Sequence, residues 1–216
     1  MNEESPIKYI YCVRHGESES NAGAVRQGPE TPLTEKGMEQ AEVVGKRLKN
    51  LPVEVLIASS MVRARQTAEI ISGHIEKPLE FTDLAIERQM PSVVYWKHRE
   101  DPETNVLIDK LKEAFEVPGW RHSDEENFDD LRARAQKALD FLAARPETHI
   151  ALVTHAHFLI TLLSVAALGD ALTGAVYRKM IESFRHENTG ITILEYHSGV
   201  AYPWRIVTWN DHAHLG

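Results

Sequence analysis

The chain has 216 residues and a formal net charge of −8, from 24 lysines and arginines against 32 aspartates and glutamates. This length suits one large domain, or one domain with an insertion, and it is enough to bury a sizeable core. Nucleic acid would have to be held against the net negative charge, so a general polyanion-binding function is disfavoured, whereas a local phosphate site needs only local positive charge.

The chain carries a single cysteine, Cys12, which rules out an intramolecular disulfide. Residues 1–6 are acidic and polar and do not resemble a secretory signal. The longest apolar stretch, residues 158–168, is shorter than the about 20 residues that a bilayer requires. We therefore expect a cytoplasmic protein with neither membrane nor nucleic acid among its partners.

The first predicted element is an apolar strand over residues 7–13, which runs directly into Arg14-His15-Gly16-Glu17. This tetrapeptide places an imidazole beside a guanidinium where the strand ends. A helix is predicted to open at Thr34, because apolar residues follow it at near-helical spacing. The residues expected on its inner face are Met38, Ala41, Val44 and Leu48.

A second apolar strand is predicted over residues 53–58. Ser59-Ser60 follow as candidate helix caps, and Arg63 lies in the first turn of the next predicted helix. One stripe of that helix is apolar and is expected to face the core. It consists of Ala64, Ala68, Ile71 and Ile75.

Residues 89–124 interrupt the alternation of strands and helices. This segment is rich in charge, and Pro91, Pro102 and Pro118 separate what we expect to be short helices. We interpret it as a cap that selects the substrate, inserted in a single domain over residues 1–216; a solvated surface excursion is the alternative. The side chains that could face a substrate are Trp96, Lys97, His98, Arg99, Trp120, Arg121 and His122.

The remaining predicted elements are a helix, a strand and a hairpin. The helix begins near Asn127 and ends before Pro146, and a buried strand over residues 149–154 then delivers His155 at its end. The hairpin joins residues 190–196 and 202–207. Helices alternating with apolar strands predict an α/β fold with a mostly parallel sheet and an antiparallel element at its edge.

Three of the predicted strands deliver chemically active side chains at their carboxyl ends. In open α/β sheets ligands lie in the crevice beyond those ends. The sequence therefore predicts that two histidines and two arginines surround one anion: Arg14, His15, Arg63 and His155.

Several separated motifs follow one another along the chain. The first is Arg14-His15-Gly16-Glu17-Ser18, with Asn21, and the last is Val153-Thr154-His155. Between them lie Gln27-Gly28, Pro32-Leu33-Thr34-Glu35-Lys36-Gly37, Gln40-Ala41 and Ser59-Ser60-Met61-Val62-Arg63-Ala64-Arg65-Gln66-Thr67-Ala68. In this order the chain resembles the histidine phosphatase superfamily, which includes the cofactor-dependent phosphoglycerate mutases. The resemblance implies a phosphoglycerate mutase-like three-layer α/β/α sandwich.

The resemblance also implies the residue roles. His15 would be the nucleophile, phosphorylated on a ring nitrogen, and Arg14, Arg63 and His155 would hold the transferring phosphoryl group. The acid position falls on Glu87, although Glu17 lies beside the nucleophile and could compete. Further substrate or phosphate contacts are expected at Asn21, Gln27, Gly28 and Ala156.

The same roles are physically reasonable. A nucleophilic imidazole must be neutral, and two neighbouring arginines disfavour its protonation. Cations around the site also spread the charge of a loose phosphoryl-transfer transition state. No metal or other cofactor is then required, and we expect none.

The predicted function is a metal-independent phosphomonoesterase that acts on a small phosphorylated metabolite through phospho-His15. A phosphoglycerate-type mutase is one alternative. Mutases of the family usually show a Tyr-Gly pair after the acid and a later Arg-Arg pair, whereas this chain has Arg88-Gln89-Met90-Pro91-Ser92 and no Arg-Arg pair. A phosphoprotein phosphatase is another alternative, but it would need an open site, which the 89–124 segment argues against.

Two further histidine pairs leave other interpretations open. His157 stands where the family often has glycine, and with His155 it could form half of a metal site, although the remaining ligands are not evident. His212 and His214 repeat the spacing in what we expect to be a disordered end. A non-catalytic phosphate-binding role is also open, as is a homodimer in place of a monomer, with the region of Trp204 and Trp209 as a contact surface.

Overall fold

The computed structural model describes residues 6–26 and 28–216. Gln27, one of the predicted phosphate contacts, lies outside the described residues. The described strands form one sheet in the order β3-β2-β4-β1-β5-β6. Their bounds are β1 Lys8–Arg14, β2 Val55–Ser59, β3 Leu79–Thr82, β4 His149–Thr154, β5 Ile191–Tyr196 and β6 Trp204–Asp211.

The directions of these strands are those expected from the sequence. β1, β2, β3 and β4 run parallel, whereas β5 is antiparallel to β1 and β6 is antiparallel to β5. The antiparallel pair lies at one edge of the sheet, as the predicted hairpin required. The carboxyl ends of the parallel strands therefore meet at one edge, together with the beginning of β5.

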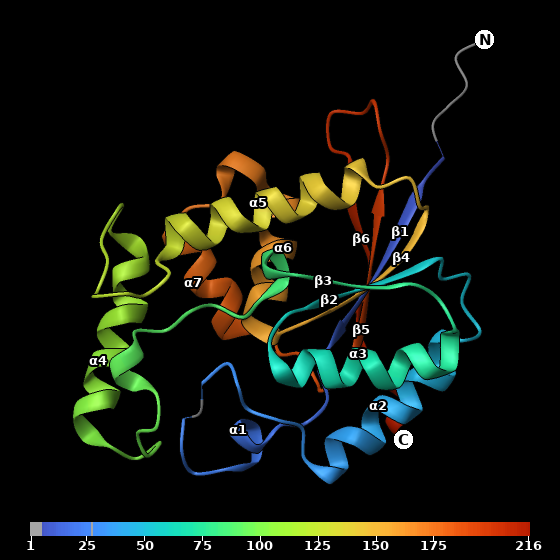
Figure 1. Ribbon diagram of the computed structural model, residues 1–216. Coiled ribbons are helices and arrows are strands. Elements are labelled where there is room, and N and C mark those ends of the chain that lie inside the picture. The colour runs from blue at the N-terminus through green and yellow to red at the C-terminus, as the bar shows by residue number, and fades with distance from the viewer. Residues whose placement is uncertain (1–5, 27) are drawn as a thin grey trace.

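Helices cover both faces of the sheet (Figure 1). α2 and α3 lie on one face and α5 and α6 on the other, while α4 stands to one side of the sheet. The bounds of the described helices are α1 Glu19–Ala22, α2 Glu35–Leu48, α3 Val62–Ile75, α4 Pro102–Glu113, α5 Phe128–Ala144, α6 Ala156–Leu168 and α7 Gly174–Ser183. The result is the expected three-layer α/β/α sandwich.

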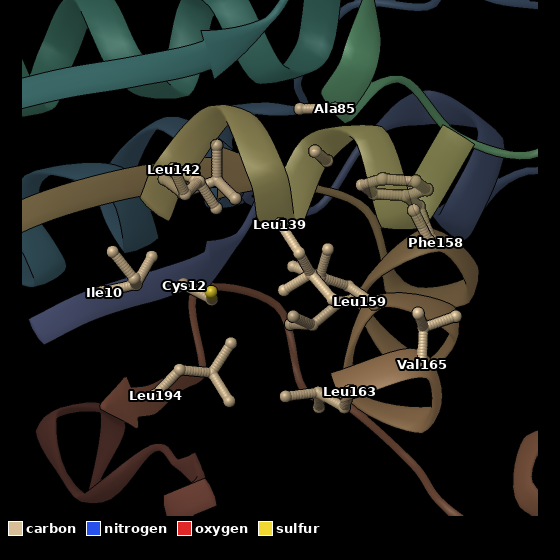
Figure 2. Packing of buried hydrophobic residues seen from close by; sticks show 14 of the residues in the cluster. Ile10, Cys12, Ala85, Leu139, Leu142, Phe158, Leu159, Leu163, Val165 and Leu194 are labelled. Atoms are coloured by element: carbon tan, nitrogen blue, oxygen red, sulfur yellow. The ribbon is translucent and has the colours of Figure 1, made fainter. Parts of the chain in front are cut away.

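The core divides at the sheet because successive strand residues point to opposite faces. On one face Ile10 and Cys12 of β1 pack with residues of α5 and α6, including Leu139 and Phe158 (Figure 2). On the other face the alternate residues of β1 and β2 pack with α2 and α3. Cys12 is fully buried in the first of these clusters and carries a free thiol.

The predicted inner face of α2 is wrong at one position. Met38 is 43% exposed, and Gly37 faces inward in its place. The reason is steric, because a Cβ on Gly37 would lie 1.9 Å from the carbonyl oxygen of Glu17. The first turn of α2 thus presents bare backbone to the loop after β1, and the larger side chain turns outward.

The region of Trp204 and Trp209 contributes to the fold of the monomer. Both rings are half-buried and pack against the core on the α6 side of the sheet. Trp209 also lies against Phe184, with ring centroids 4.6 Å apart. Among the described helices, none is both long enough and apolar enough to cross a bilayer.

Candidate active site

The pairing of β1 with β4 brings the two predicted catalytic histidines together. Arg14 is in register with Thr154, so the residues that follow them, His15 and His155, emerge side by side. Their ring centroids are 5.0 Å apart. Arg63 reaches the same point from the first turn of α3. The predicted convergence at the carboxyl edge of the sheet is thus present in the structure.

The imidazole of His15 is buried and has one defined hydrogen-bonding pattern. Its Nδ1 lies 2.7 Å from the carbonyl oxygen of Gly16, and its Nε2 lies 3.2 Å from Nε of Arg63. A carbonyl only accepts, so Nδ1 carries the proton, and Nε2 keeps its lone pair and accepts from Arg63. Burial, then Arg63 and Arg14, holds the pKa of His15 well below its usual range, which keeps the ring neutral.

The loop that carries His15 is held by the residues of the family-like motifs. A Cβ on Gly16 would lie 2.3 Å from the carbonyl oxygen of Gly37, so the two glycines allow α2 to approach the loop closely. The amide of Gly16 donates to Oγ1 of Thr67 at 3.1 Å, and the amide of Glu17 donates to Oε1 of Gln40 at 2.8 Å. These motif residues therefore position the loop.

Arg14 and His155 each leave a buried nitrogen unpaired in the described part of the chain: Nε of Arg14 and Nδ1 of His155. The guanidinium of Arg14 is held by the carbonyl oxygen of His186, and Nε2 of His155 lies 2.8 Å from Oγ of Ser59. Burial and the nearby Arg63 keep the pKa of His155 well below its usual range. Unpaired buried nitrogens and positive charge fit a bound phosphoryl group.

Glu87 lies at the amino terminus of α6. Its carboxylate accepts from the amides of Arg88 at 3.0 Å, of Phe158 at 2.9 Å and of His157 at 3.2 Å. Helix amides favour a negative group at that position. The amides of His157 and Phe158, in the first turn of α6, therefore donate to Glu87 and cannot also bind a substrate anion. These contacts hold the carboxyl group in the wall of the cavity.

The Glu87 segment is anchored by two arginines, the partly buried Arg134 and the buried Arg88. Arg134 of α5 donates to the carbonyl oxygens of Leu84 at 3.0 Å and of Ile86 at 2.9 Å, and it holds the Glu126 carboxylate through two hydrogen bonds of 2.6 and 2.7 Å. Arg88 pairs with Glu125 at 2.7 Å, both side chains being almost fully buried. The two ends of the 89–124 segment are therefore fixed beside each other.

A cavity of about 200 Å³ unites most of the predicted site residues. Arg14, His15, Asn21, Gly28, Arg63 and Glu87 line it. His155 lies behind them against His15, and Ala156 lines a neighbouring cavity that also reaches Arg14. The sequence did not predict the other lining residues, which are Ser18, Pro29, Met61, Arg88, Met90 and Tyr95.

The aromatic and basic side chains nominated in the 89–124 segment do not line this cavity. Trp96, Lys97, His98 and Arg99 are exposed, and their backbone pairs with residues 24–26. Trp120 lines a separate small cavity, Arg121 is paired with Asp130 on the surface, and His122 stacks on Trp120. The segment contributes Met90 and Tyr95 to the cavity instead.

The side chains of His157 and Glu17 do not line the cavity that contains His15. The His157 ring packs edge-on against Tyr177 and Phe115, away from the partners of His155. Within the described residues, no group of three or more histidine, cysteine, aspartate or glutamate side chains could hold a metal ion. Glu17 pairs with Lys36 at 2.9 Å, and this hydrogen bond lowers the pKa of the Glu17 carboxyl.

Three arginines and a neutral histidine line this cavity of an α/β fold, and this arrangement suits a phosphate group. The model of the histidine phosphatase superfamily (branch 1) matches residues 10–212, and the chain belongs to that family. By class it is an enzyme, a phosphoric monoester hydrolase.

Individual relatives match almost the whole chain. The chain is 32% identical over 216 residues to a probable phosphoglycerate mutase GpmB of Proteus mirabilis, and the match covers 95% of this chain and 94% of the relative. It is 29% identical over 226 residues to a metal-independent phosphoserine phosphatase of Arabidopsis thaliana, covering 98% and 85%. Among solved structures, YhfR of Bacillus stearothermophilus superposes with a TM-score of 0.77 at 26% identity, covering 97% and 100%.

Proposed function

We propose that the protein is a metal-independent phosphomonoesterase that transfers the phosphoryl group of a small phosphorylated metabolite to His15 and then to water. The observation that carries this proposal is the pair of contacts at the His15 ring, Nδ1 to Gly16 and Nε2 to Arg63. They leave a neutral imidazole with its lone pair on the nitrogen that faces positive charge.

In the first step, Nε2 of His15 forms a bond to phosphorus while the bond from phosphorus to the ester oxygen breaks. Arg63 is hydrogen-bonded to Nε2 of His15, and Arg14 lines the same cavity. The transition state of phosphoryl transfer spreads negative charge over the phosphoryl oxygens, so fixed cations lower its free energy. Nδ1 of His155, which is buried behind the His15 ring and unpaired among the described residues, is proposed as a further contact of the phosphoryl group.

The leaving oxygen needs a proton, and Glu87 is the proposed acid. The negative charge of a bound phosphate favours the protonated form of the adjacent Glu87. Glu87 then gives this proton to the departing alcohol and, as a carboxylate, takes one from the water that attacks phospho-His15. The enzyme returns to its starting protonation state after one turnover. The hydrogen bonds from α6 keep the carboxyl group in one orientation throughout.

The size of the cavity supports a small substrate. About 200 Å³ holds a phosphoryl group and a modest alcohol, below the usual range for drug-sized ligands. Tyr95 and Met90 lie in its wall and also in that of an adjoining cavity of about 420 Å³. These two residues are therefore placed to contact the alcohol portion of the substrate.

The decisive experiment is hydrolysis of p-nitrophenyl phosphate and of sugar, glycerate, nucleotide and phosphoserine esters in the presence of a chelator. We expect turnover by the wild type, an acid-labile phosphohistidine trapped during turnover, and loss of both in His15→Ala. His98→Ala, which changes an exposed histidine, is the matched control. Turnover that requires an added metal, or that survives in His15→Ala, would refute the proposal.

A mutase is the second candidate, and the GpmB relative favours it. It shares the first half-reaction but returns the phosphoryl group to a second alcohol. Conversion of 3-phosphoglycerate to 2-phosphoglycerate that depends on a bisphosphate primer and exceeds phosphate release would establish the mutase. Phosphate release that needs no primer supports the phosphatase.

A further inference from the structure

The loop before β5, residues 186–190, encloses the end of β1. The amide of Thr189 donates to the carbonyl oxygen of Arg14 at 3.0 Å, and the amide of Arg14 donates to the carbonyl oxygen of Gly190 at 3.3 Å. The side chain of Asn188 donates from Nδ2 to the carbonyl oxygen of His15 at 2.9 Å. A segment more than 170 residues further along the chain thus holds the backbone of both residues.

The contact from Asn188 fixes the peptide plane that joins His15 to Gly16. The oxygen of this peptide accepts from Asn188 and its N–H donates to Thr67, so both ends of the plane are held. The next carbonyl, that of Gly16, receives the Nδ1 proton of the His15 ring. Rotation of the plane would therefore move the carbonyl that orients the imidazole.

Thr189 adopts a conformation that its side chain disfavours. It is fully buried and has a φ of 58°, in the left-handed region, where a β-branched residue is a genuine outlier. Such strain persists only where the surroundings over-determine it, and it is concentrated at functional sites. The Thr189 hydroxyl donates to the carbonyl oxygen of Asn188 at 2.7 Å. The side chain of the strained Thr189 therefore holds the backbone of Asn188.

The turn at residues 213–215, which the sequence suggested was disordered, reaches this loop. His214 places Nδ1 3.0 Å from Nη1 of Arg47 and Nε2 3.3 Å from Oγ1 of Thr189. A guanidinium only donates, so Nδ1 accepts and the ring proton lies on Nε2, which donates to Thr189. Asp211 anchors Arg47. The donor and the acceptor of each hydrogen bond from Arg47 to Asn188 are therefore defined.

We infer that Asn188 is a positioning residue for the nucleophilic His15, and that His214 holds Asn188 in place through Thr189. The inference rests on the proposed function, because it concerns the aim of the His15 ring. Attack on phosphorus requires an aligned approach, and a misplacement of about 1 Å can reduce the rate on the order of 100-fold. The contacts from Arg47 form one path through His214, Thr189 and Asn188 to the backbone carbonyl of His15. The Gly16 carbonyl, in the adjoining peptide, then meets Nδ1 of the imidazole.

The test compares substitutions at both ends of this path. Asn188→Ala should lower kcat roughly 10- to 100-fold, with little change in KM, and should slow formation of phosphohistidine in single-turnover experiments. His214→Ala should have a smaller effect in the same direction. His214→Gln should restore the rate because its amide can replace the Nε2 proton, whereas His214→Asn should not. His197→Ala, which removes another half-buried histidine, is the control.

A double-mutant cycle tests the connection itself. If the two residues act through one path, Asn188→Ala with His214→Ala should be no slower than Asn188→Ala alone. Wild-type kcat in folded Asn188→Ala would overturn the positioning role. Multiplicative effects in the double variant, or a Gln substitution as harmful as Ala at position 214, would overturn the role of His214.

A readout independent of turnover separates this inference from the proposed function. Nitrogen-15 NMR of the His15 ring should show one tautomer, protonated on Nδ1, in the wild type and a mixture of tautomers in Asn188→Ala. An unchanged spectrum in the variant would overturn the inference even if the enzyme is active. If the wild type gave no phosphohistidine, the proposed function would fail while the spectrum still decided the positioning role.

Discussion

Nε of Arg63 donates to Nε2 of His15 at 3.2 Å. The guanidinium therefore lies in the direction from which the substrate phosphorus must approach Nε2. When Nε2 bonds to phosphorus this hydrogen bond is lost, and the guanidinium is free to meet a phosphoryl oxygen. Arg63 therefore exchanges one partner for another in the proposed reaction. The planar fork of arginine suits that exchange better than an ammonium group does.

Arg63→Lys should lower kcat/KM on p-nitrophenyl phosphate roughly 100-fold, because an ammonium group cannot replace the planar guanidinium that contacts first Nε2 of His15 and then a phosphoryl oxygen. It should also weaken inhibition by orthovanadate, which mimics the transferring phosphoryl group. Arg65→Lys on the same helix is the control, since the Arg65 guanidinium lies over the Phe81 ring at 4.5 Å and away from the cavity. Equal losses in the two variants would contradict the assignment.

Glu87→Gln should reduce hydrolysis of alkyl phosphates about 100-fold more than hydrolysis of p-nitrophenyl phosphate, because an aryl oxide leaves without protonation. A plot of log kcat/KM against leaving-group pKa should therefore steepen in the variant. Glu17→Gln tests the competing carboxyl group and should leave the slope unchanged. If Glu17→Gln produced the steeper slope, the acid would be Glu17.

Gly16→Ala should damage both stability and turnover, because the added Cβ would lie 2.3 Å from the backbone oxygen of Gly37. Overpacking of this kind costs about 1–3 kcal/mol of unfolding free energy. Gly28→Ala is the control for stability, since a Cβ there meets nothing within 4 Å. Urea unfolding of both variants is the measurement, and equal midpoints would show that the α2 contact is not tight.

Glu125→Ala should destabilise the protein by about 3–5 kcal/mol, because it leaves the buried Arg88 guanidinium without its carboxylate. Arg121→Ala removes a pair whose side chains are 47% and 40% exposed and should cost at most about 1 kcal/mol. Replacing Arg88 and Glu125 together by methionine and leucine should recover most of the loss. Equilibrium unfolding in urea measures all three, and a small effect of Glu125→Ala would contradict this assessment.

Acid should destabilise the fold through its buried histidines. Burial lowers the pKa of His157 from 6.5 to about 4, so below pH 6.5 the unfolded chain binds a proton that the folded chain does not. The stability associated with neutral His157 is thus complete above pH 6.5 and is lost as the pH falls towards 4.

His157→Phe should therefore reduce the loss of unfolding free energy between pH 7.5 and pH 5 by about 2 kcal/mol. The difference between variant and wild type at pH 7.5 measures the change in packing alone, because the histidine is neutral there in both states. Urea unfolding at the two pH values is the measurement. The same pH dependence in both proteins would show that His157 does not titrate in this way.

The parallel part of the site could be predicted because it follows one simple rule. Strand ends deliver Arg14, His15 and His155, and parallel strands end at the same edge. The acid segment could be placed only by resemblance, because Glu87 is positioned by α6 amides and by Arg134, none of which is near it in sequence. The contacts that Arg134 and α6 make with the Glu87 segment depend on tertiary packing, which the hydrophobic periodicity of the sequence does not predict.

The contribution of Asn188 was missed although a signal was present. The predicted hairpin makes the strand at 190–196 antiparallel, so its beginning lies at the edge where the parallel strands end. Residues just before that strand were therefore candidates for the site. In contrast, the outward direction of Trp96 was not predictable, because it depends on a left-handed backbone with φ of 66° and on pairing with residues 24–26.

The ends of the 89–124 segment are fastened to each other as well as to α5. Gln89 accepts from the amide of Glu126 at 2.9 Å, next to the Arg88–Glu125 pair. The segment is thus a loop with a closed stem, and lengthening such a loop adds little to the entropy of closing it. Related chains can therefore acquire a longer or shorter insertion here while the group proposed to protonate the leaving alcohol keeps its place. A change in the length of this segment, which carries Met90 and Tyr95, therefore need not move Glu87.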